Sequence, residues 1–452
     1  MPNIILLMSD DQGWSETGYN GHPYVKTPVL DEMARGGVRF NSFYAASPVC
    51  TPTRASVITG RNSNRCGALT YSYSLRPEEI SIAHLVRKKG YVTSLFGKWH
   101  LGPSKAVSPV NPGAMGFDYW LSHDNFFGVN PMLSRNGSSP EQFHGEGSEI
   151  IVSESISWIQ DQQKSGQPFF TVIWFGSPHG PYASADHDFR HYEFLRHKMG
   201  SEVIPHRYAE ITAMDRSIGH LQDYLKEQGL FENTIIWFCS DNGLPKEALT
   251  DHETLRGRKG LVYENGIRVP SVLQWPAKFS SPKEVDAPCV TSDILPTLCD
   301  FLDIDLPQRP LDGISIENIL NKNLTERPSP ICFWYYDFKQ VETEKLEWYM
   351  EPELLMGDIP TSKIESIQFQ NFVHPVAQST NFGGISAVRG NQYKLVQPKP
   401  GVFELYDMDN DLTESTNLVM QHPEIAEPLR KKLLDWQRSV ERSHTGSDYS
   451  NQ

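Results

Sequence analysis

Four short apolar runs of the chain are each followed, within a few residues, by side chains that can bind a metal or an anion. The runs cover residues 4–8, 91–96, 169–175 and 234–239. In chain order they lead into Asp10 and Asp11, Lys98 and His100, His179, and Asp241 and Asn242. One such coincidence would carry little weight, but four in one chain indicate a single site built from several segments.

Two complementary sets of side chains stand out among these residues and their neighbours. The first offers only oxygen ligands, which suit a hard cation such as Ca²⁺ or Mg²⁺ better than zinc. Its members are Asp10, Asp11, Asp241 and Asn242. The second offers donors for a tetrahedral oxyanion, because guanidinium and ammonium groups bind sulfate and phosphate well. Its members are Arg54, Lys98, His100, His179 and Lys259. A metal beside several cations predicts a site that cleaves a sulfate or phosphate ester.

Each segment taken alone also has a structural explanation. The alternatives are a strand-ending turn at 10–11, a solvated loop at 97–102, a packed loop histidine at 179, an Asn-Gly hairpin at 242–243 and an exposed basic loop at 255–260. Only the joint pattern favours the functional interpretation.

The elements that would position these side chains follow from the surrounding sequence. Continuous apolar runs of this length are typical of strands buried on both faces, and the helical segments between them indicate parallel connections. In such sheets, ligands collect at the carboxyl ends of the strands. A helix is expected within residues 27–37, with Thr27 as its cap, Pro28 at its first position and Gly36 at its end.

Cys50 stands near the start of the stretch PVCTPTRASVITGR, residues 48–61, where Pro52 indicates the first turn of a helix. A helix N-terminus would stabilise its thiolate, and Arg54 lies one turn further along the same face. The alternative is a small buried apolar side chain, which is the commonest role of a free cysteine. The other cysteines, at positions 66, 239, 289, 299 and 332, lack the spacing of a zinc finger or a dense disulfide scaffold.

Length and composition limit the class of protein. With 452 residues, of which 38% are hydrophobic and 11% aromatic, the chain can form two domains or one large core. The formal net charge of −14 argues against non-specific nucleic-acid binding, although a local basic pocket can still bind an anion. No apolar run approaches the roughly 20 residues of a membrane span. The first run is too short for a signal peptide, which leaves open a cytoplasmic protein or an exported one without its signal peptide.

The sequence CTPTR at residues 50–54 matches the C-x-P-x-R signature of type I, formylglycine-dependent sulfatases, and the match extends to Arg61. Further segments resemble the same family in order along nearly the whole chain. They include DDQGW at 10–14, GKWHLG at 97–102, SPHGPY at 177–182, SDNG at 240–243 and RGRKGLVYENGIRVP at 256–270. CTPTR alone could occur by chance, whereas the ordered set is specific. The chain is thus similar to arylsulfatases and carbohydrate sulfatases, which implies an α/β fold of the alkaline-phosphatase-like superfamily.

The resemblance implies a role for each candidate residue. Cys50 would be converted to Cα-formylglycine by a formylglycine-generating maturation enzyme. One Ca²⁺ would be held by Asp10, Asp11, the modified Cys50, Asp241 and Asn242. Arg54 and His100 would orient the hydrated aldehyde. Lys98, His179 and Lys259 would bind the sulfate, with His179 or Lys98 protonating the leaving alcohol.

The chemistry of formylglycine gives a reason for modifying the cysteine. The aldehyde hydrate carries two hydroxyls on one carbon, and one of them attacks sulfur with help from the metal and a carboxylate such as Asp241. After the alcohol leaves, the second hydroxyl loses its proton and the carbon expels sulfate as the aldehyde re-forms. A serine could form the first bond but lacks this exit.

Two domains are predicted. Residues 1–325 would form an α/β domain with a large, mostly parallel central sheet flanked by helices. Residues 326–452 would form a smaller α+β domain with an antiparallel sheet. An insertion relative to compact family members is expected at about 337–382, as either a solvated excursion or a wall of the substrate cleft. Asn265 replaces a glycine common in the family, and the loop is expected to survive because asparagine tolerates a left-handed backbone.

The smaller domain has its own pattern. Residues 385–396 and 402–408 predict antiparallel strands, and residues 424–440 predict a closing amphipathic helix. The apolar stripe of that helix would comprise Ile425, Leu429, Leu433 and Leu434.

The predicted function is hydrolysis of sulfate monoesters on a carbohydrate, either a glycosaminoglycan or an algal galactan such as carrageenan. Several side chains near the predicted loops could contact sugar rings or simply pack: Trp14, His22, Tyr73, His123, Phe126 and Phe127. The resemblance favours an exported protein, periplasmic or extracellular. One rival is a phosphate or phosphonate ester hydrolase, for which a second set of metal ligands is not evident. Another is a non-catalytic binder of sulfated glycans with Cys50 unmodified.

Overall fold

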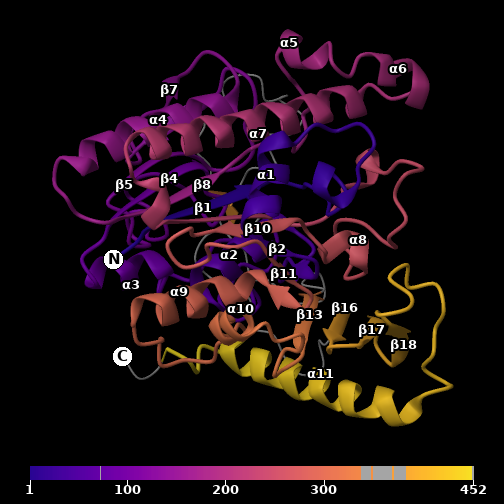
Figure 1. Cartoon of the computed structure of the whole chain (residues 1–452). Coiled ribbons are helices and arrows are strands. Elements are labelled where there is room, and N and C mark those ends of the chain that lie inside the picture. The colour runs from indigo at the N-terminus through magenta and orange to yellow at the C-terminus, as the bar shows by residue number, and fades with distance from the viewer. Residues whose placement is uncertain (72, 337–347, 350–368, 371–382, 450–452) are drawn as a thin grey trace.

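The structure is a computed structural model and describes residues 1–71, 73–336, 348–349, 369–370 and 383–449. A ten-stranded sheet runs through its centre (Figure 1). In spatial order its strands are β11 (Lys283–Val285), β2 (Val38–Phe40), β10 (Ser271–Gln274), β9 (Thr234–Ser240), β1 (Asn3–Ser9), β8 (Phe169–Trp174), β4 (Val92–Lys98), β5 (Tyr119–His123), β6 (Met132–Arg135) and β7 (Glu141–Gln142). The five strands from β9 to β5 are parallel, and antiparallel pairs occur on both sides of them. The predicted mostly parallel sheet is confirmed.

The four predicted apolar runs are the central strands β1, β4, β8 and β9, each within two residues of its predicted bounds. Every side chain of β8 and β9 is buried. Both faces of the sheet are therefore covered, as continuous apolar runs require.

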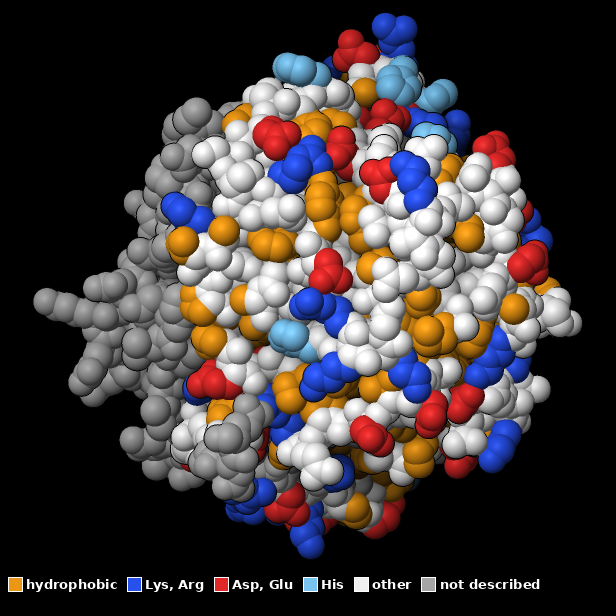
Figure 2. Space-filling model, turned by 90° about the vertical axis from the view of Figure 1, so that its left-hand side faces the viewer, with side chains coloured by type: hydrophobic (Ala, Val, Ile, Leu, Met, Phe, Trp, Pro, Cys, Tyr) orange, Lys and Arg blue, Asp and Glu red, His pale blue; other side chains and the backbone are white. Residues whose placement is uncertain are grey.

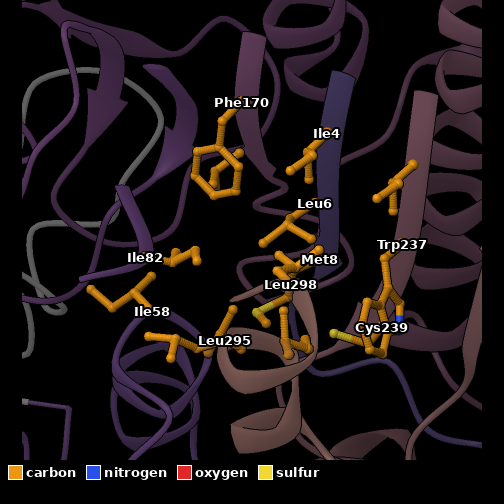
Figure 3. Close-up of a cluster of buried hydrophobic side chains, with 14 of the residues drawn as sticks. Ile4, Leu6, Met8, Ile58, Ile82, Phe170, Trp237, Cys239, Leu295 and Leu298 are labelled. Atoms are coloured by element: carbon orange, nitrogen blue, oxygen red, sulfur yellow. The ribbon is translucent and has the colours of Figure 1, made fainter. Parts of the chain in front are cut away.

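Successive side chains of the central strands point into two different cores because strand side chains alternate between faces. Ile5 and Leu7 pack in the core under α1 (Pro28–Gly36), α4 (Gly147–Gln163) and α7 (Val203–Glu227). Ile4, Leu6 and Met8 pack in the opposite core, against α2 (Cys50–Thr59), α3 (Ile82–Lys88) and α9 (Ile294–Leu302) (Figure 3). Figure 1 shows these two helical layers on opposite sides of the sheet.

The helix predicted after residue 27 is α1, but its N-terminus is capped differently from the prediction. Thr27 makes no capping bond to the helix, since its hydroxyl donates to Asp31 Oδ1 at 3.0 Å. Asp215 of α7 instead accepts from the N–H groups of Val29 and Leu30, at 3.0 and 2.8 Å. The cap therefore comes from a neighbouring helix, which local sequence does not reveal.

The C-terminal part contains a separate antiparallel sheet, as predicted. Its order is β13 (Ile331–Tyr336), β16 (Gly384–Arg389), β17 (Tyr393–Lys399) and β18 (Val402–Asp407). The closing helix α11 (Pro423–His444) packs on it, with Leu433 fully buried. Leu434 lies outside the apolar cluster that contains Ile425, Leu429 and Leu433. The predicted stripe was wrong there, because one residue turns a helix by about 100°.

The remaining elements are short. They are β3 (Phe43–Tyr44) paired with β12 (Cys289–Val290), β14 (Trp348–Tyr349) paired with β15 (Phe369–Gln370), α5 (Asp186–Phe189), α6 (Phe194–Met199), α8 (Glu264–Ile267), α10 (Glu317–Lys322) and the 3₁₀ turns at Gly18–Asn20, Phe231–Asn233, Lys246–Ala248 and Thr291–Asp293. Apart from β14 and β15, the expected 337–382 insertion lies outside the described residues. The boundary at residue 325 stays a prediction.

One face of the molecule carries charged side chains of both signs. Figure 2 shows acidic and basic side chains interspersed with apolar ones over the face in view. Among the described residues, no helix combines the length and apolar character needed to cross a membrane.

Candidate active site

The strand order brings the four predicted segments to one edge of the sheet. β9, β1, β8 and β4 lie side by side and parallel, so their carboxyl ends face the same way. Ser9 and Ser240 pair in register at the ends of β1 and β9. Asp10 and Asp241 therefore leave the sheet at the same level, although 231 residues separate them along the chain.

Asp11 is held in a left-handed conformation, with φ of 68°. Its N–H donates to Asp241 Oδ1 at 2.9 Å. Its Oδ1 accepts from Asn242 Nδ2 at 2.7 Å and from Lys259 Nζ at 2.6 Å. Non-glycine residues in this region are uncommon and concentrate at functional sites, so the backbone geometry marks this loop as more than a strand-ending turn.

The oxygen-rich set can hold a hard cation. Atoms of Asp10, Cys50 and Asp241 lie within 4.8 Å of one another, as do atoms of Asp10, Asp11 and His179. Asp10 Oδ1 and Asn242 Oδ1 are buried and accept no hydrogen bond from the described residues. Because a buried acceptor without a partner is costly, a cation between these oxygens would stabilise both. The residues present thus fit Ca²⁺, as the resemblance implies.

Arg54 and Lys98 neutralise the buried carboxylates. Both side chains are fully buried. Arg54 donates from Nε and Nη2 to Asp241 Oδ2 at 3.1 and 2.7 Å, and its guanidinium lies 5.1 Å from the ring centre of Trp174. Lys98 Nζ donates to Asp10 Oδ2 at 2.6 Å. Arg54 is thus fixed to the acidic set.

His179 and Lys259 form the accessible side of the cluster, with side-chain exposures of 19% and 21%. The imidazole of His179 stacks on Phe126, with ring centres 5.1 Å apart and 9° between planes. Its Nδ1 lies 2.5 Å from the carbonyl oxygen of Gly180, which places a proton on that nitrogen. Its Nε2, 3.7 Å from Asp11 Oδ2, is the nitrogen directed into the cluster.

His100 completes the predicted set from the floor of the site. It is buried and also left-handed, with φ of 55°. Its carbonyl accepts from the hydroxyl of Thr51, the residue after Cys50, at 2.9 Å. Burial lowers the pKa of His100 well below its ordinary value, and nearby Lys98 and Arg54 lower it further. The imidazole is therefore neutral at pH 7.

The predicted stabilisation of a Cys50 thiolate was wrong. Cys50 is the first residue of α2 and is 3% exposed. Burial raises the pKa of the thiol above its ordinary value, and this outweighs the opposing effect of Lys98 and Lys259. Arg54 turns its guanidinium towards Asp241, as its hydrogen bonds show. An unmodified Cys50 is thus a neutral thiol, which is a poor nucleophile.

The electrostatics of the other groups follow from the same cluster. Burial would raise the pKa of Asp11, but Lys259 and His179 bring it well below its ordinary value. Burial, followed by repulsion from Asp10, raises the pKa of Asp241 to about 6. Burial lowers the pKa of His179 to about 3, against the attraction of Asp11. A bound cation would favour ionised Asp241, and an anionic ester would favour protonated His179.

The loop of residues 240–243 is no hairpin. Gly243 is needed because a Cβ there would lie 1.9 Å from the carbonyl oxygen of Asn265 in α8. Its N–H donates to the carbonyl of Gly266 at 3.0 Å. Asn265 is not among the residues with positive φ, so its tolerance of a left-handed backbone is not what this loop requires. Asparagine is accommodated because it lies in a helical turn.

Sequence reasoning missed three residues that complete the site. Arg207 of α7 is fully buried and donates to the carbonyl of Asp11 at 2.6 Å, while Glu16 holds the other side of its guanidinium. Tyr335 of β13 is half-buried, and its hydroxyl lies 3.2 Å from Thr70 Oγ1. Burial raises its pKa, and Thr70 and Lys259 partly offset that rise. None of the three has a local signal, since an arginine within a helix and a tyrosine within a strand are ordinary.

A hollow opens beside His179. It is lined by Phe126, Phe127, Gly128, Val129, Asn130, Pro131, His179, Pro181 and Ala183. None of these side chains is acidic, and none is Lys or Arg. Of the other proposed sugar contacts, Tyr73 and His123 are buried, His22 is bonded to Tyr208, and Trp14 lies under Arg268.

The comparisons with known proteins agree with this geometry. A sequence model of the family described as "Sulfatase" matches residues 2–304. The chain belongs to the sulfatase family. The predicted family is confirmed, and with it the enzyme class, the sulfate-ester hydrolases. The shared part contains β1, β4, β8, β9 and every candidate residue of this sulfatase.

Two of the curated relatives of this sulfatase have names that mention a carbohydrate. An "Ulvan-active sulfatase" from Formosa agariphila is 32% identical in an alignment of length 345 that covers 73% of this chain and 66% of the relative. An "N-acetylgalactosamine-6-sulfatase" from Mus musculus is 30% identical in an alignment of length 374 that covers 74% of this chain and 68% of the relative. The chain thus spans about two thirds of the length of each.

Solved structures share the fold. The crystal structure titled "Ps i-CgsB in complex with k-i-k-neocarrahexaose" superposes with a TM-score of 0.80. It covers 97% of this chain and 93% of its own, at 21% identity. At that identity the likeness shows the architecture of this sulfatase, not its substrate.

Proposed function

We propose that this protein hydrolyses sulfate monoesters of a carbohydrate, with formylglycine made from Cys50 as its nucleophile and one Ca²⁺ beside it. The observation that carries this proposal is the convergence, near Cys50, of several cationic side chains and of buried oxygens that accept no hydrogen bond from the part of the chain that the structure describes. The names of the relatives favour a sulfated polysaccharide or oligosaccharide.

The calcium site would be formed by Asp10, Asp11, residue 50, Asp241 and Asn242. When bound, Ca²⁺ supplies positive charge that favours an ionised nucleophile and stabilises the anionic oxygens of the ester. The protein contributes the rest: Arg54 holds Asp241 through two hydrogen bonds, and Asn242 and Lys259 hold Asp11. Because these groups are locked before substrate arrives, little reorganisation is needed during reaction.

The three candidates for binding the sulfate, Lys98, His179 and Lys259, lie at different depths in the site. Lys98 is fully buried against Asp10, so it suits the inner oxygens of the sulfate. Lys259 and His179 lie at the accessible side, where the ester oxygen and the leaving alcohol would be. This position favours His179 over Lys98 as the acid, since a proton donor must reach the leaving oxygen.

The hollow beside His179 is suited to an uncharged part of the leaving alcohol. A second sulfate or a uronate carboxylate placed among Phe127, Val129 and Pro131 would lose its hydration without gaining a cation. The apolar C–H face of a sugar ring would lose nothing polar. We therefore favour a sugar whose sulfated carbon adjoins an uncharged ring face.

The rival phosphate-ester activity receives less support. Such enzymes generally need two metals, and the two candidate ligand groups among the described residues share Asp10. They thus define one location rather than two. The formylglycine-generating enzyme as partner, and export to the periplasm or outside the cell, remain predictions.

The test is a desulfation screen over defined sulfated oligosaccharides, with the phosphate analogues assayed in parallel. The protein would be co-expressed with the maturation enzyme, and the peptide of residues 48–61 analysed by mass spectrometry. We expect an aldehyde at residue 50 and release of sulfate from at least one neutral-sugar monosulfate. Faster phosphate release, or an intact thiol after co-expression, would contradict the proposal.

A further inference from the structure

Arg207 is a buried arginine that contacts the backbone of two loops of the site. It lies near the N-terminal end of α7 and is fully buried. Its Nη2 donates to the carbonyl of Asp11 at 2.6 Å. Its Nη1 donates to the carbonyl of Pro178, the residue before His179, at 2.9 Å. One guanidinium thus bridges the loop after β1 and the loop after β8.

The other edge of the guanidinium is fixed by Glu16. Arg207 donates from Nε to Glu16 Oε1 at 2.7 Å and from Nη2 to Oε2 at 2.6 Å. Glu16 in turn accepts from the N–H of Gly13 at 3.0 Å, and its carbonyl accepts from Gln12 Nε2 at 2.8 Å. The whole loop after β1 is therefore folded around this pair. Only a planar fork can make these contacts together, so lysine is no substitute.

The two bridged carbonyls belong to Asp11 and to Pro178, which directly precedes His179. Asp11 is left-handed, a conformation that costs free energy and persists only when its surroundings enforce it. His179 must keep Nε2 directed at the reacting oxygen. We propose that Arg207 is a positioning residue. It keeps the loop of Asp11, which would bind Ca²⁺, and the loop of His179, which would supply the acid, in a fixed relative position. This inference rests on the proposed function, which assigns those roles to Asp11 and His179.

The chain offers a matched control in Arg327. This arginine is 4% exposed and donates to both carboxylate oxygens of Asp293, from Nη1 at 2.6 Å and Nη2 at 2.8 Å. Neither residue contacts a candidate active-site group through any of these bonds. Replacing either arginine by glutamine leaves a buried carboxylate without its cation, so the loss of stability should be similar. Only Arg207→Gln should disturb the site.

The experiment compares the matured wild type with Arg207→Gln, Arg207→Lys and Arg327→Gln. Calorimetric Ca²⁺ titration and thermal unfolding are measured together with kcat/KM for an activated aryl sulfate and for a carbohydrate sulfate. We expect both Arg207 variants to bind Ca²⁺ about tenfold more weakly, with little rescue by lysine. The carbohydrate sulfate should lose at least about tenfold more kcat/KM than the aryl sulfate, because its poorer leaving group depends more on the acid.

Arg327→Gln should lower only the unfolding temperature. Equal Ca²⁺ affinity in Arg207→Gln and wild type, or the same kinetic pattern in Arg207→Gln and Arg327→Gln, would overturn the positioning role. If Arg207→Gln does not fold, Glu16→Gln provides the measurement, since it keeps the arginine but loosens its fork. A wild type inactive on every sulfate ester would refute the proposed function alone, because the Ca²⁺ titration still tests the register of the Asp11 loop.

Discussion

Two buried clusters of charge in this molecule look alike in composition but differ in what their oxygens face. The site cluster comprises Asp10, Asp11, Arg54, Lys98, Asp241 and Lys259. The Lys394 cluster, where β17 meets α8, comprises Glu264, Arg268, Arg389, Lys394 and Glu414. Lys394 is fully buried, and its Nζ lies 2.9 Å from Glu264 Oε1 and 2.9 Å from Glu414 Oε1.

In the Lys394 cluster each carboxylate accepts a hydrogen bond from a protein group outside the cluster's basic side chains or from its backbone. Glu264 Oε2 accepts from the hydroxyl of Tyr44 at 3.1 Å, and Glu414 Oε2 accepts from the N–H of Glu264 at 2.7 Å. Glu414 Oε1 accepts no hydrogen bond from the described residues, but it lies 2.9 Å from the ammonium of Lys394. In the site cluster, Asp10 Oδ1 and the adjoining Asn242 Oδ1 also accept no hydrogen bond from the described residues, and they come from two different loops. Neither burial of charge nor a single missing hydrogen bond therefore distinguishes function from structure. The distinguishing feature of the site cluster is that oxygens without a hydrogen bond come from two loops that meet at one place.

The sharpest way to test this distinction is Cys50→Ala in the matured protein. The variant should lose at least about 10³-fold in kcat while still binding substrate, because the nucleophile is gone but the cations remain. Steady-state sulfate release and substrate calorimetry measure the two effects. Cys239→Ala, in the core beside Trp237 (Figure 3), is the matched control and should keep its turnover. Comparable activity of Cys50→Ala and wild type would refute the nucleophile assignment.

Lys394→Met should have the opposite effect to Cys50→Ala, because it should lower stability and leave kcat unchanged. It leaves two buried carboxylates beside each other, so the free energy of unfolding should fall by about 3–5 kcal/mol. Urea denaturation measures this loss, while kcat per folded molecule should stay unchanged. Lys399→Met, at the exposed end of the same strand, should have little effect on either quantity. A loss of kcat in Lys394→Met without loss of stability would show that the clusters are not distinct.

Removal of Ca²⁺ should affect only the site cluster. An ion at about 100 times its Kd stabilises the folded state by about 2.7 kcal/mol, so protein prepared in a strong chelator should unfold at a lower temperature and turn over more slowly. Scanning calorimetry with and without Ca²⁺ measures the shift. Asp10→Asn should remove most of the Ca²⁺ dependence. The metal site would be excluded if wild-type protein refolded in chelator showed the same activity and the same unfolding temperature with and without added Ca²⁺.

Glu146 is a buried carboxylate that accepts hydrogen bonds but forms no ion pair with the described residues. Its replacement should have the smallest effect on stability of the variants considered. Its Oε2 accepts from the N–H of Glu149 at 2.9 Å. Burial, only partly offset by such bonds, raises its pKa from 4.5 to about 7. The stability that its proton contributes is thus fully present below pH about 4.5 and is lost as the pH rises through about 7.

Glu146→Gln should remove that loss, which amounts to about 1–3 kcal/mol. The free energy of unfolding, measured between pH 4.5 and 8, should fall less steeply with rising pH than in wild type. Glu149→Gln, half-exposed on the same turn, serves as the control. Parallel pH profiles for wild type and Glu146→Gln would contradict the raised pKa.

The sequence by itself determined the elements and the chemistry of the site. Apolar runs placed β1, β4, β8 and β9 within two residues of their bounds, because burial on both faces requires continuous hydrophobic stretches. The motif at residues 50–54 indicated the family, and the residue types indicated a hard cation and an oxyanion. These properties are local, since each depends on a side chain and its near neighbours in the chain.

Only the tertiary structure decided what those residues do to one another. It buried Cys50 enough to reverse the expected shift of its thiol pKa, and it replaced Thr27 with Asp215 as the cap of α1. It also brought Arg207 to the site from a helix without any motif, and paired it with Glu16. Desolvation and hydrogen bonding depend on which distant segments pack together, and that information is absent from any single window of the sequence.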